Sequence, residues 1–286
     1  MPAFCIGDIT FNYVDIGTGV PFVFEHGLGG DVRQPVNVFT PQQGVRLLAL
    51  DARAHGETVW CGDPLELNFG TFADDLIALL NQVGVARAVV GGISMGAGVA
   101  LNVAVRYPER VAGLVLSRPA WLDRTMPPRT VALYALIARL LRTLDYSADT
   151  DEGLDWAWRH LERDATFAAI AERYPDCAWS LRGQLMARRA VDGVARLERL
   201  PRDRPIQNLR AAATIRVPTL VLAHHDDPIH LCEFGTTLAR AIPGAQCVEV
   251  TSKSIDRQRH DAQIQRAIAA FLDQYRDTPA TVRAAA

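Results

Sequence analysis

A chain of 286 residues can bury one large hydrophobic core, with or without an inserted subdomain. Hydrophobic residues make up 49% of the sequence and charged residues 22%, which excludes the composition of a disordered protein. The formal net charge of −2 gives no electrostatic reason to expect a nucleic acid or a membrane surface as a partner.

The first 25 residues have the pattern of β-strands. Residues 9–17 alternate between apolar and polar side chains, a Gly-Thr-Gly turn follows, and residues 20–25 are mostly apolar. Further short apolar runs predict strands at 45–51, 86–92, 111–117, 218–224 and 245–250. Runs that are apolar on both faces are typical of strands buried in a mostly parallel sheet.

Helical patterns fall between these runs. Residues 71–85 predict a helix with Thr71 as its N-cap and an end at Gly84. Residues 95–111 and 261–276 predict two more helices. Alternation of strands and helices predicts an α/β sandwich with right-handed crossovers.

Residues 121–212 interrupt this alternation. They contain helical patterns but no convincing strand, and they hold four of the five tryptophans. We therefore expect a core domain formed by residues 1–120 and 213–286, with a helical lid inserted at 121–212. Trp121 directly follows the strand at 111–117, so it is the predicted pocket-facing residue of the lid.

A glycine–x–serine–x–glycine sequence is centred on Ser94, between a predicted strand and a predicted helix. A tight strand-to-helix turn holds the serine in a strained backbone conformation, and the small residues Gly92 and Gly96 avoid collisions there. The backbone N–H of Met95 lies at the helix N-terminus, where developing negative charge is favoured. The pattern therefore predicts a nucleophilic serine.

At this point the sequence resembles the α/β-hydrolase superfamily over nearly its whole length. Besides the Ser94 motif, "EHGLGG" at 25–30 is similar to the loop that follows the third strand of that family, and "DARAHGET" at 51–58 is similar to a structural turn. The resemblance implies a sheet of about eight mostly parallel strands, and it implies that Leu28 N–H completes an oxyanion hole with Met95 N–H. His26 is expected to shape its loop and not to act as a base.

The stretch "LAHHDDPIH" at 222–230 is the expected location of the acid. In the family the acid follows the strand that ends here, and Asp227 before Pro228 occupies that position; Asp226 and Asp123 remain alternatives. A metal site made by His224, His225 and the two aspartates is disfavoured, because neighbouring side chains on a turn diverge and no known ligand spacing is present.

The base is expected last in the chain order serine, aspartate, histidine. His260, just before the last predicted helix, is the only histidine beyond His230, so His260 is the predicted base. His230 is expected to line the mouth of the pocket and to contact the substrate.

This set of residues predicts a cofactor-independent hydrolase with no metal. Ser94 would attack a small carboxylic ester, lactone or thioester, with His260 as base and Asp227 orienting it. The alternatives are a carbon–carbon bond hydrolase, a perhydrolase or a lyase on the same triad, or a non-catalytic ligand-binding protein. The serine disfavours haloalkane dehalogenases and epoxide hydrolases of this fold, which need aspartate at that position.

The remaining features concern location and partners. Five scattered cysteines without a C-x-x-C pair favour reduced thiols in a cytoplasm over a zinc site or a disulfide framework. The N-terminus lacks the pattern of a signal peptide, and the longest apolar stretch, 131–141, is too short to span a bilayer. We expect a cytoplasmic monomer or homodimer that binds a small-molecule substrate.

Overall fold

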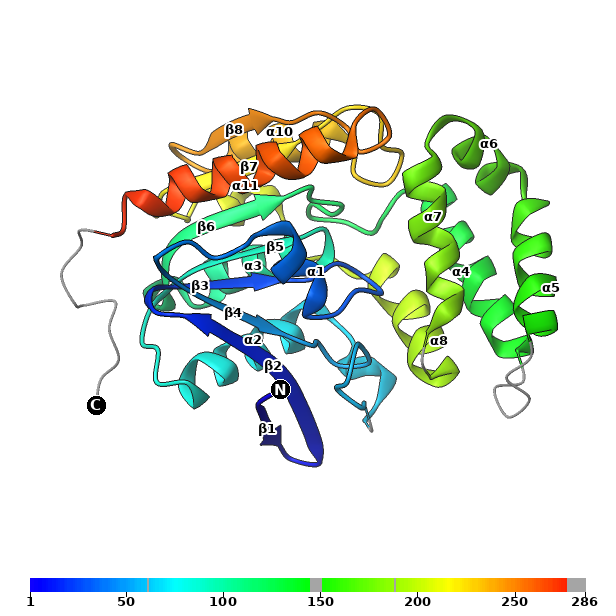
Figure 1. The fold of residues 1–286 in the computed structure, drawn as a ribbon, viewed down its shortest axis with the longest axis horizontal. Coiled ribbons are helices and arrows are strands. Elements are labelled where there is room, and N and C mark those ends of the chain that lie inside the picture. Colours follow the sequence, from blue (N-terminus) through cyan, green and yellow to red (C-terminus); the bar gives the residue numbers. More distant parts are fainter. Residues whose placement is uncertain (61, 145–150, 188, 277–286) are drawn as a thin grey trace.

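A computed structural model describes residues 1–60, 62–144, 151–187 and 189–276. Its centre is an eight-stranded sheet in the order β1-β2-β4-β3-β5-β6-β7-β8 (Figure 1). The strands are β1 (Ala3–Ile6), β2 (Ile9–Gly17), β3 (Gly19–Glu25), β4 (Gly44–Leu50), β5 (Ala88–Ile93), β6 (Val111–Ser117), β7 (Thr219–Ala223) and β8 (Gln246–Glu249). The five pairs from β4–β3 to β7–β8 are parallel, and the pairs β1–β2 and β2–β4 are antiparallel. The predicted mostly parallel α/β sheet is confirmed.

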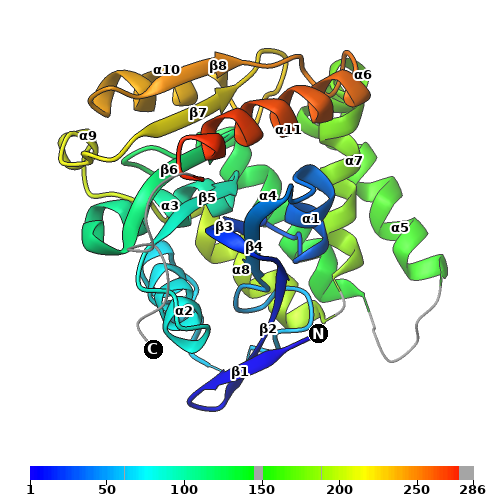
Figure 2. The ribbon, with the colours of Figure 1, turned by 60° about the vertical axis from the view of Figure 1, so that its left-hand side comes forward.

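Helices cover both faces of this sheet (Figure 2). One face is covered by α1 (Arg33–Val38) and α11 (Arg257–Asp273), and the other by α2 (Phe69–Gln82), α3 (Met95–Arg106) and α10 (Cys232–Ala241). Phe22 and Phe24 of β3 face the first group of helices, whereas Val23 between them packs with the second. Alternate residues of one strand therefore belong to two separate cores, which is why the strands are apolar on both faces.

The helix α2 begins earlier than the sequence predicts. Its N-cap is Asn68, whose side chain accepts a hydrogen bond from Thr71 N–H, so the predicted N-cap at Thr71 is wrong by three residues. Both residue types can cap a helix, and the preceding residues decide which one does. The predicted end is confirmed, because Gly84 has a left-handed φ of +67° and Val85 N–H donates to Leu80 O.

Between β6 and β7 the described chain is helical. It forms α4 (Pro128–Thr143), α5 (Asp151–Glu162), α6 (Ala165–Arg173), α7 (Pro175–Gly183), α8 (Ala190–Arg199) and α9 (Leu209–Ala212), besides short 3-10 turns at η3 (Gln184–Met186) and η4 (Leu200–Arg202). Two more 3-10 turns lie outside this segment, η1 (Pro64–Glu66) and η2 (Pro108–Arg110). The helices α4 to α8 gather beside the carboxyl ends of the parallel strands (Figure 1). Residues 121–212 as a separate lid remain a prediction.

In the described part of the chain, no helix combines the length and the apolar character that a membrane span requires.

Candidate active site

Ser94 occupies a strained turn between β5 and α3. Its φ of +56° is rare for a residue with a side chain, and its N–H donates to Ser117 O of the neighbouring strand. A Cβ atom on Gly92 would lie 2.3 Å from the backbone of Gly96, and one on Gly96 would lie 2.4 Å from Glu25 O. The two glycines therefore allow β3, β5 and α3 to meet, and the predicted strand–turn–helix context of Ser94 is confirmed.

The side chain that contacts Ser94 belongs to His230. Its Nε2 lies 2.9 Å from Ser94 Oγ, and its Nδ1 lies 2.8 Å from Asp227 Oδ2. An ionised carboxylate only accepts hydrogen bonds, so Nδ1 carries the proton in the neutral imidazole and Nε2 accepts the bond from the Ser94 hydroxyl. This is the tautomer that a general base next to a serine requires.

Asp227 is held in place by its own turn. Its Oδ1 accepts hydrogen bonds from the N–H groups of Ile229 and His230, both at 2.9 Å, which leaves Oδ2 free for the imidazole. Burial acts to raise the pKa of this carboxyl, but His230 and the Arg118 guanidinium together outweigh that effect and hold the pKa well below its ordinary value. Asp227 is therefore ionised wherever the imidazole is neutral.

Within the described residues, neither alternative for the acid forms a hydrogen bond with His230, whose Nδ1 contacts Asp227. Asp226 adopts a left-handed φ of +57° at the turn. Asp123 Oδ2 accepts a hydrogen bond from Leu209 N–H and is not part of the Ser94 cluster.

His224 is buried while His225 is exposed and lies near Glu249, so the two neighbouring imidazoles point apart. Within the described residues, no group of three or more histidine, cysteine, aspartate or glutamate side chains is arranged to hold a metal ion.

The prediction that His260 reaches Ser94 is wrong. His260 lies in the first turn of α11, fully buried, and its Nδ1 is 2.7 Å from Thr251 O. Its ring packs edge-on against His224, and burial together with Arg118 lowers the pKa of His260 to about 3. A neutral, enclosed imidazole that contacts Thr251 O and His224 is not placed to take the proton of Ser94.

His230 was predicted to line the pocket, and it does, but its contact with Ser94 was missed. A signal was present in the sequence, since aspartate and histidine three residues apart on one turn can hydrogen-bond to each other. His230 also follows Asp227 in the chain, so the order serine, aspartate, histidine is preserved.

Hydrogen bonds from Gly27 and His26 hold the loop after β3. Gly27 N–H donates to Gln34 Oε1 at 2.6 Å, whereas no acceptor for Leu28 N–H or Met95 N–H is present among the described residues. His26 is buried, accepts a hydrogen bond from Ala52 N–H through Nε2, and therefore donates from Nδ1 to Gly27 O. His26 shapes this loop, as expected from the sequence.

A residue that the sequence did not indicate reaches this loop from the helical segment. Gln184, in the 3-10 turn after α7, donates from Nε2 to Leu28 O at 2.9 Å. The bond fixes the peptide that follows Leu28, so the helical segment directly supports the candidate oxyanion loop.

A small cavity of about 90 Å³ opens beside Ser94. It is bounded by the Leu28 loop, by the ends of the strands and by α4 and α7 of the helical segment. Its polar lining includes Arg118 and Lys253, neither of which the sequence singled out. A cavity below the range of about 300–1,000 Å³ typical of drug-sized ligands suits a small substrate.

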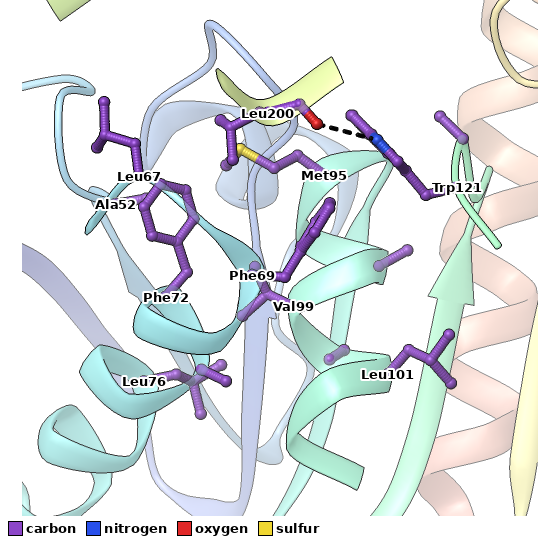
Figure 3. Close-up of a cluster of buried hydrophobic side chains, with 14 of the residues drawn as sticks. Ala52, Leu67, Phe69, Phe72, Leu76, Met95, Val99, Leu101, Trp121 and Leu200 are labelled. Atoms are coloured by element: carbon purple, nitrogen blue, oxygen red, sulfur yellow. Dashed lines mark hydrogen bonds between the residues drawn. The ribbon is translucent and has the colours of Figure 1, made fainter. Parts of the chain in front are cut away.

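Trp121 does not line this cavity, so its predicted role in the pocket is wrong. The side chain is 2% exposed and donates from Nε1 to Leu200 O at 3.2 Å. Its ring packs edge-on against Phe69 at the start of α2, with 5.2 Å between centroids (Figure 3). Trp121 therefore joins the helical segment to the core, and its direction after β6 could not be read from the sequence.

Replacing Trp121 with alanine should destabilise the protein without changing its substrate preference. The loss of a buried indole should lower the free energy of unfolding by about 3–5 kcal/mol. Urea unfolding measures the loss, and Trp121→Phe, which keeps an aromatic ring against Phe69, should lose less. If Trp121→Ala unfolds at the normal urea concentration but prefers esters of a different chain length, Trp121 lines the pocket after all.

Comparisons with known proteins agree with this fold. A family model described as the alpha/beta hydrolase fold matches residues 20–267. A putative non-heme haloperoxidase of Mycobacterium phage D29 is 35% identical over 107 residues, 35% of this chain and 36% of that protein. The putative carbamate hydrolase RutD of Klebsiella pneumoniae (strain 342) is 30% identical over 196 residues, 65% of this chain and 66% of that protein. The match thus spans about a third of the first relative and just under two thirds of the second.

A thermophilic esterase from Thermogutta terrifontis has a similar solved structure. The TM-score is 0.70 at 23% identity, with 94% of each chain covered, which shows a shared fold. The family match over most of the sequence, the eight-stranded sheet and the strained serine turn at Ser94 lead to one conclusion: this chain belongs to the α/β hydrolase fold family.

Proposed function

We propose that the protein is a cofactor-independent serine hydrolase that cleaves a small carboxylic ester through an acyl-enzyme. The observation that carries this proposal is the continuous hydrogen-bonded series from Ser94 Oγ through His230 to Asp227. Ser94 is the nucleophile, His230 the general base and Asp227 the residue that orients the imidazole. The helices between β6 and β7 would serve as the lid that limits substrate size.

In the first half of the reaction, Ser94 Oγ attacks the carbonyl carbon while its proton passes to His230 Nε2. The imidazolium that forms is stabilised by Asp227 and then donates the same proton to the leaving alcohol oxygen. In the second half, water attacks the acyl carbon, gives a proton to His230, and Ser94 leaves with that proton. Each half-reaction therefore restores the neutral imidazole.

Both tetrahedral intermediates carry a negative oxygen, and Leu28 N–H and Met95 N–H are the donors we assign to it. The Met95 N–H belongs to the first turn of α3, whose dipole also favours negative charge. Because these donors are fixed before the substrate binds, they stabilise the charge without reorganisation.

The same set of residues could also transfer an acyl group to hydrogen peroxide, as a perhydrolase does. The similarity to a protein named as a putative haloperoxidase is the observation that favours this second candidate. The two activities are separated by adding peroxide to an ester assay. Release of peracid at the expense of the free acid identifies a perhydrolase.

Ser94 should react with a fluorophosphonate probe that forms a covalent adduct with activated serines. Mass spectrometry of the folded protein should place one adduct on the peptide that contains Ser94, and Ser94→Ala should abolish it. Ser117, which is also buried and whose carbonyl accepts the Ser94 N–H but which lies in β6, should stay unmodified. An unlabelled Ser94 in folded protein would refute the nucleophile assignment.

A further inference from the structure

The charged side chains that line the cavity beside Ser94 differ in whether they have a hydrogen-bond or ion-pair partner within the protein. Both acids have a partner within the protein: Asp227 Oδ2 accepts a hydrogen bond from His230 Nδ1 at 2.8 Å, and Asp176 Oδ1 lies 3.9 Å from Arg257 Nη1. Each acid of the cavity wall therefore already has a hydrogen-bond or ion-pair partner within the protein.

The two cations of the same wall have no such partner. Neither Arg118 nor Lys253 forms an ion pair or a side-chain hydrogen bond with any residue that the structure describes, and Arg118 Nε is buried without an acceptor. A buried guanidinium without an acceptor is costly unless a ligand supplies one. The wall thus has an unused capacity for negative charge.

Arg118 is fixed close to the nucleophile by the sheet. It is the residue after Ser117, whose carbonyl accepts the Ser94 N–H, and its own N–H donates to Leu222 O of β7. Its φ of +49° is left-handed, a conformation that a residue with a long side chain seldom adopts. Strain of this kind in an active-site wall indicates that the direction of the side chain matters.

Lys253 comes to the cavity from the other side. It lies in the loop between β8 and α11, and this loop is tied to the acid turn because Ser252 Oγ–H donates to Asp226 O at 3.3 Å. The sequence contains no other lysine, although it contains many arginines. The chain otherwise uses arginine as its basic residue. A specific requirement for lysine at this wall is therefore a simpler explanation than a general preference for basic residues.

The electrostatics of Lys253 agree with an incomplete site. The charge of Arg118 and then burial lower the pKa of the Lys253 ammonium to about 7; Arg257 lowers it further, while Asp261 and Asp176 oppose the shift. An anion placed between Arg118 and Lys253 would remove the repulsion and favour the charged ammonium.

We propose that Arg118 and Lys253 bind a carboxylate of the substrate, so that Ser94 acts on esters whose acid also carries a free carboxylate. This inference rests on the proposed ester hydrolysis. A guanidinium binds a carboxylate through two parallel hydrogen bonds, and the ammonium adds a third. Because two acids stand in the same wall, a singly charged carboxylate meets less repulsion there than a doubly charged phosphate would.

The kinetic test compares two esters of the same shape. Mono-p-nitrophenyl glutarate ends in a carboxylate, and p-nitrophenyl 5-methylhexanoate ends in an isopropyl group of similar size. The ratio of kcat/KM between the charged and the neutral ester should fall about 10- to 100-fold in Arg118→Gln and in Lys253→Met. Lys253→Arg should restore most of the ratio, and Arg124→Gln, on an exposed side chain of the next loop, should not change it.

The binding test does not depend on turnover. In Ser94→Ala protein, reductive methylation with ¹³C-formaldehyde labels Lys253 as the only lysine, and Lys253→Met identifies its signal beside that of the N-terminus. The signal should titrate near pH 7 in the free protein, and glutarate should raise its pKa. Arg118→Gln should weaken the binding of glutarate at least 10-fold.

The outcomes separate the two proposals. If neither ester is hydrolysed but glutarate raises the pKa of Lys253, the carboxylate site stands and ester hydrolysis fails. If the neutral ester is hydrolysed and glutarate neither binds nor shifts the Lys253 signal, hydrolysis stands and the carboxylate site is overturned. Equal kcat/KM for the two esters in the unmodified enzyme would also overturn the assigned substrate class.

Discussion

His230→Gln should lower kcat/KM for a p-nitrophenyl ester by about 10⁴- to 10⁶-fold, as loss of a base in comparable triads does. Glutamine has no group that accepts the proton of Ser94 Oγ at neutral pH, so the hydroxyl stays a weak nucleophile. The Asp227 carboxylate keeps its hydrogen bonds to backbone N–H groups, so the turn should still fold. Steady-state kinetics and the fluorophosphonate labelling rate both measure the loss.

The matched control is His260→Gln. The glutamine amide can replace the imidazole as a donor to Thr251 O, and no contact with Ser94 is lost. The variant should therefore keep its catalytic rate within about one order of magnitude, and its main effect should be on the free energy of unfolding. A large kinetic loss in His260→Gln with normal activity in His230→Gln would restore the base that the chain order alone suggested.

Asp227→Asn should lower kcat by about 10⁴-fold while leaving the fold intact. Asparagine keeps an oxygen for the backbone N–H groups of residues 229 and 230, but its amide donates to His230 Nδ1. The imidazole must then carry its proton on Nε2 and cannot accept one from Ser94. The loss should appear in kcat more than in KM, because orientation and proton transfer are affected while the shape of the cavity is kept.

Asp226→Asn is the control for this change at the neighbouring position. Asp226 has a left-handed backbone, a conformation that asparagine adopts as readily as aspartate, so both activity and stability should stay close to those of the unmodified protein. Similar losses in the two variants would show that the whole turn, and not the Asp227 carboxylate, is what the reaction depends on.

The sequence by itself determined the fold and the centre of the site. Apolar runs separated by helical patterns predicted the parallel sheet, because burial on both faces requires apolar residues at successive positions. The position of Ser94 was equally readable, since small residues stand at 92 and 96 between a strand pattern and a helix pattern. These features depend on neighbours in the chain.

Only the tertiary structure decided which histidine meets Ser94 and where Trp121 points. His230 and His260 both follow Asp227 in the chain. Which of the two side chains reaches Ser94 depends on the paths of the loops that follow β7 and β8. The same holds for Arg118 and Lys253, which come from separate strand ends and line one cavity. Contacts between distant segments depend on loop conformation and packing, and neither leaves a periodic signal in the sequence.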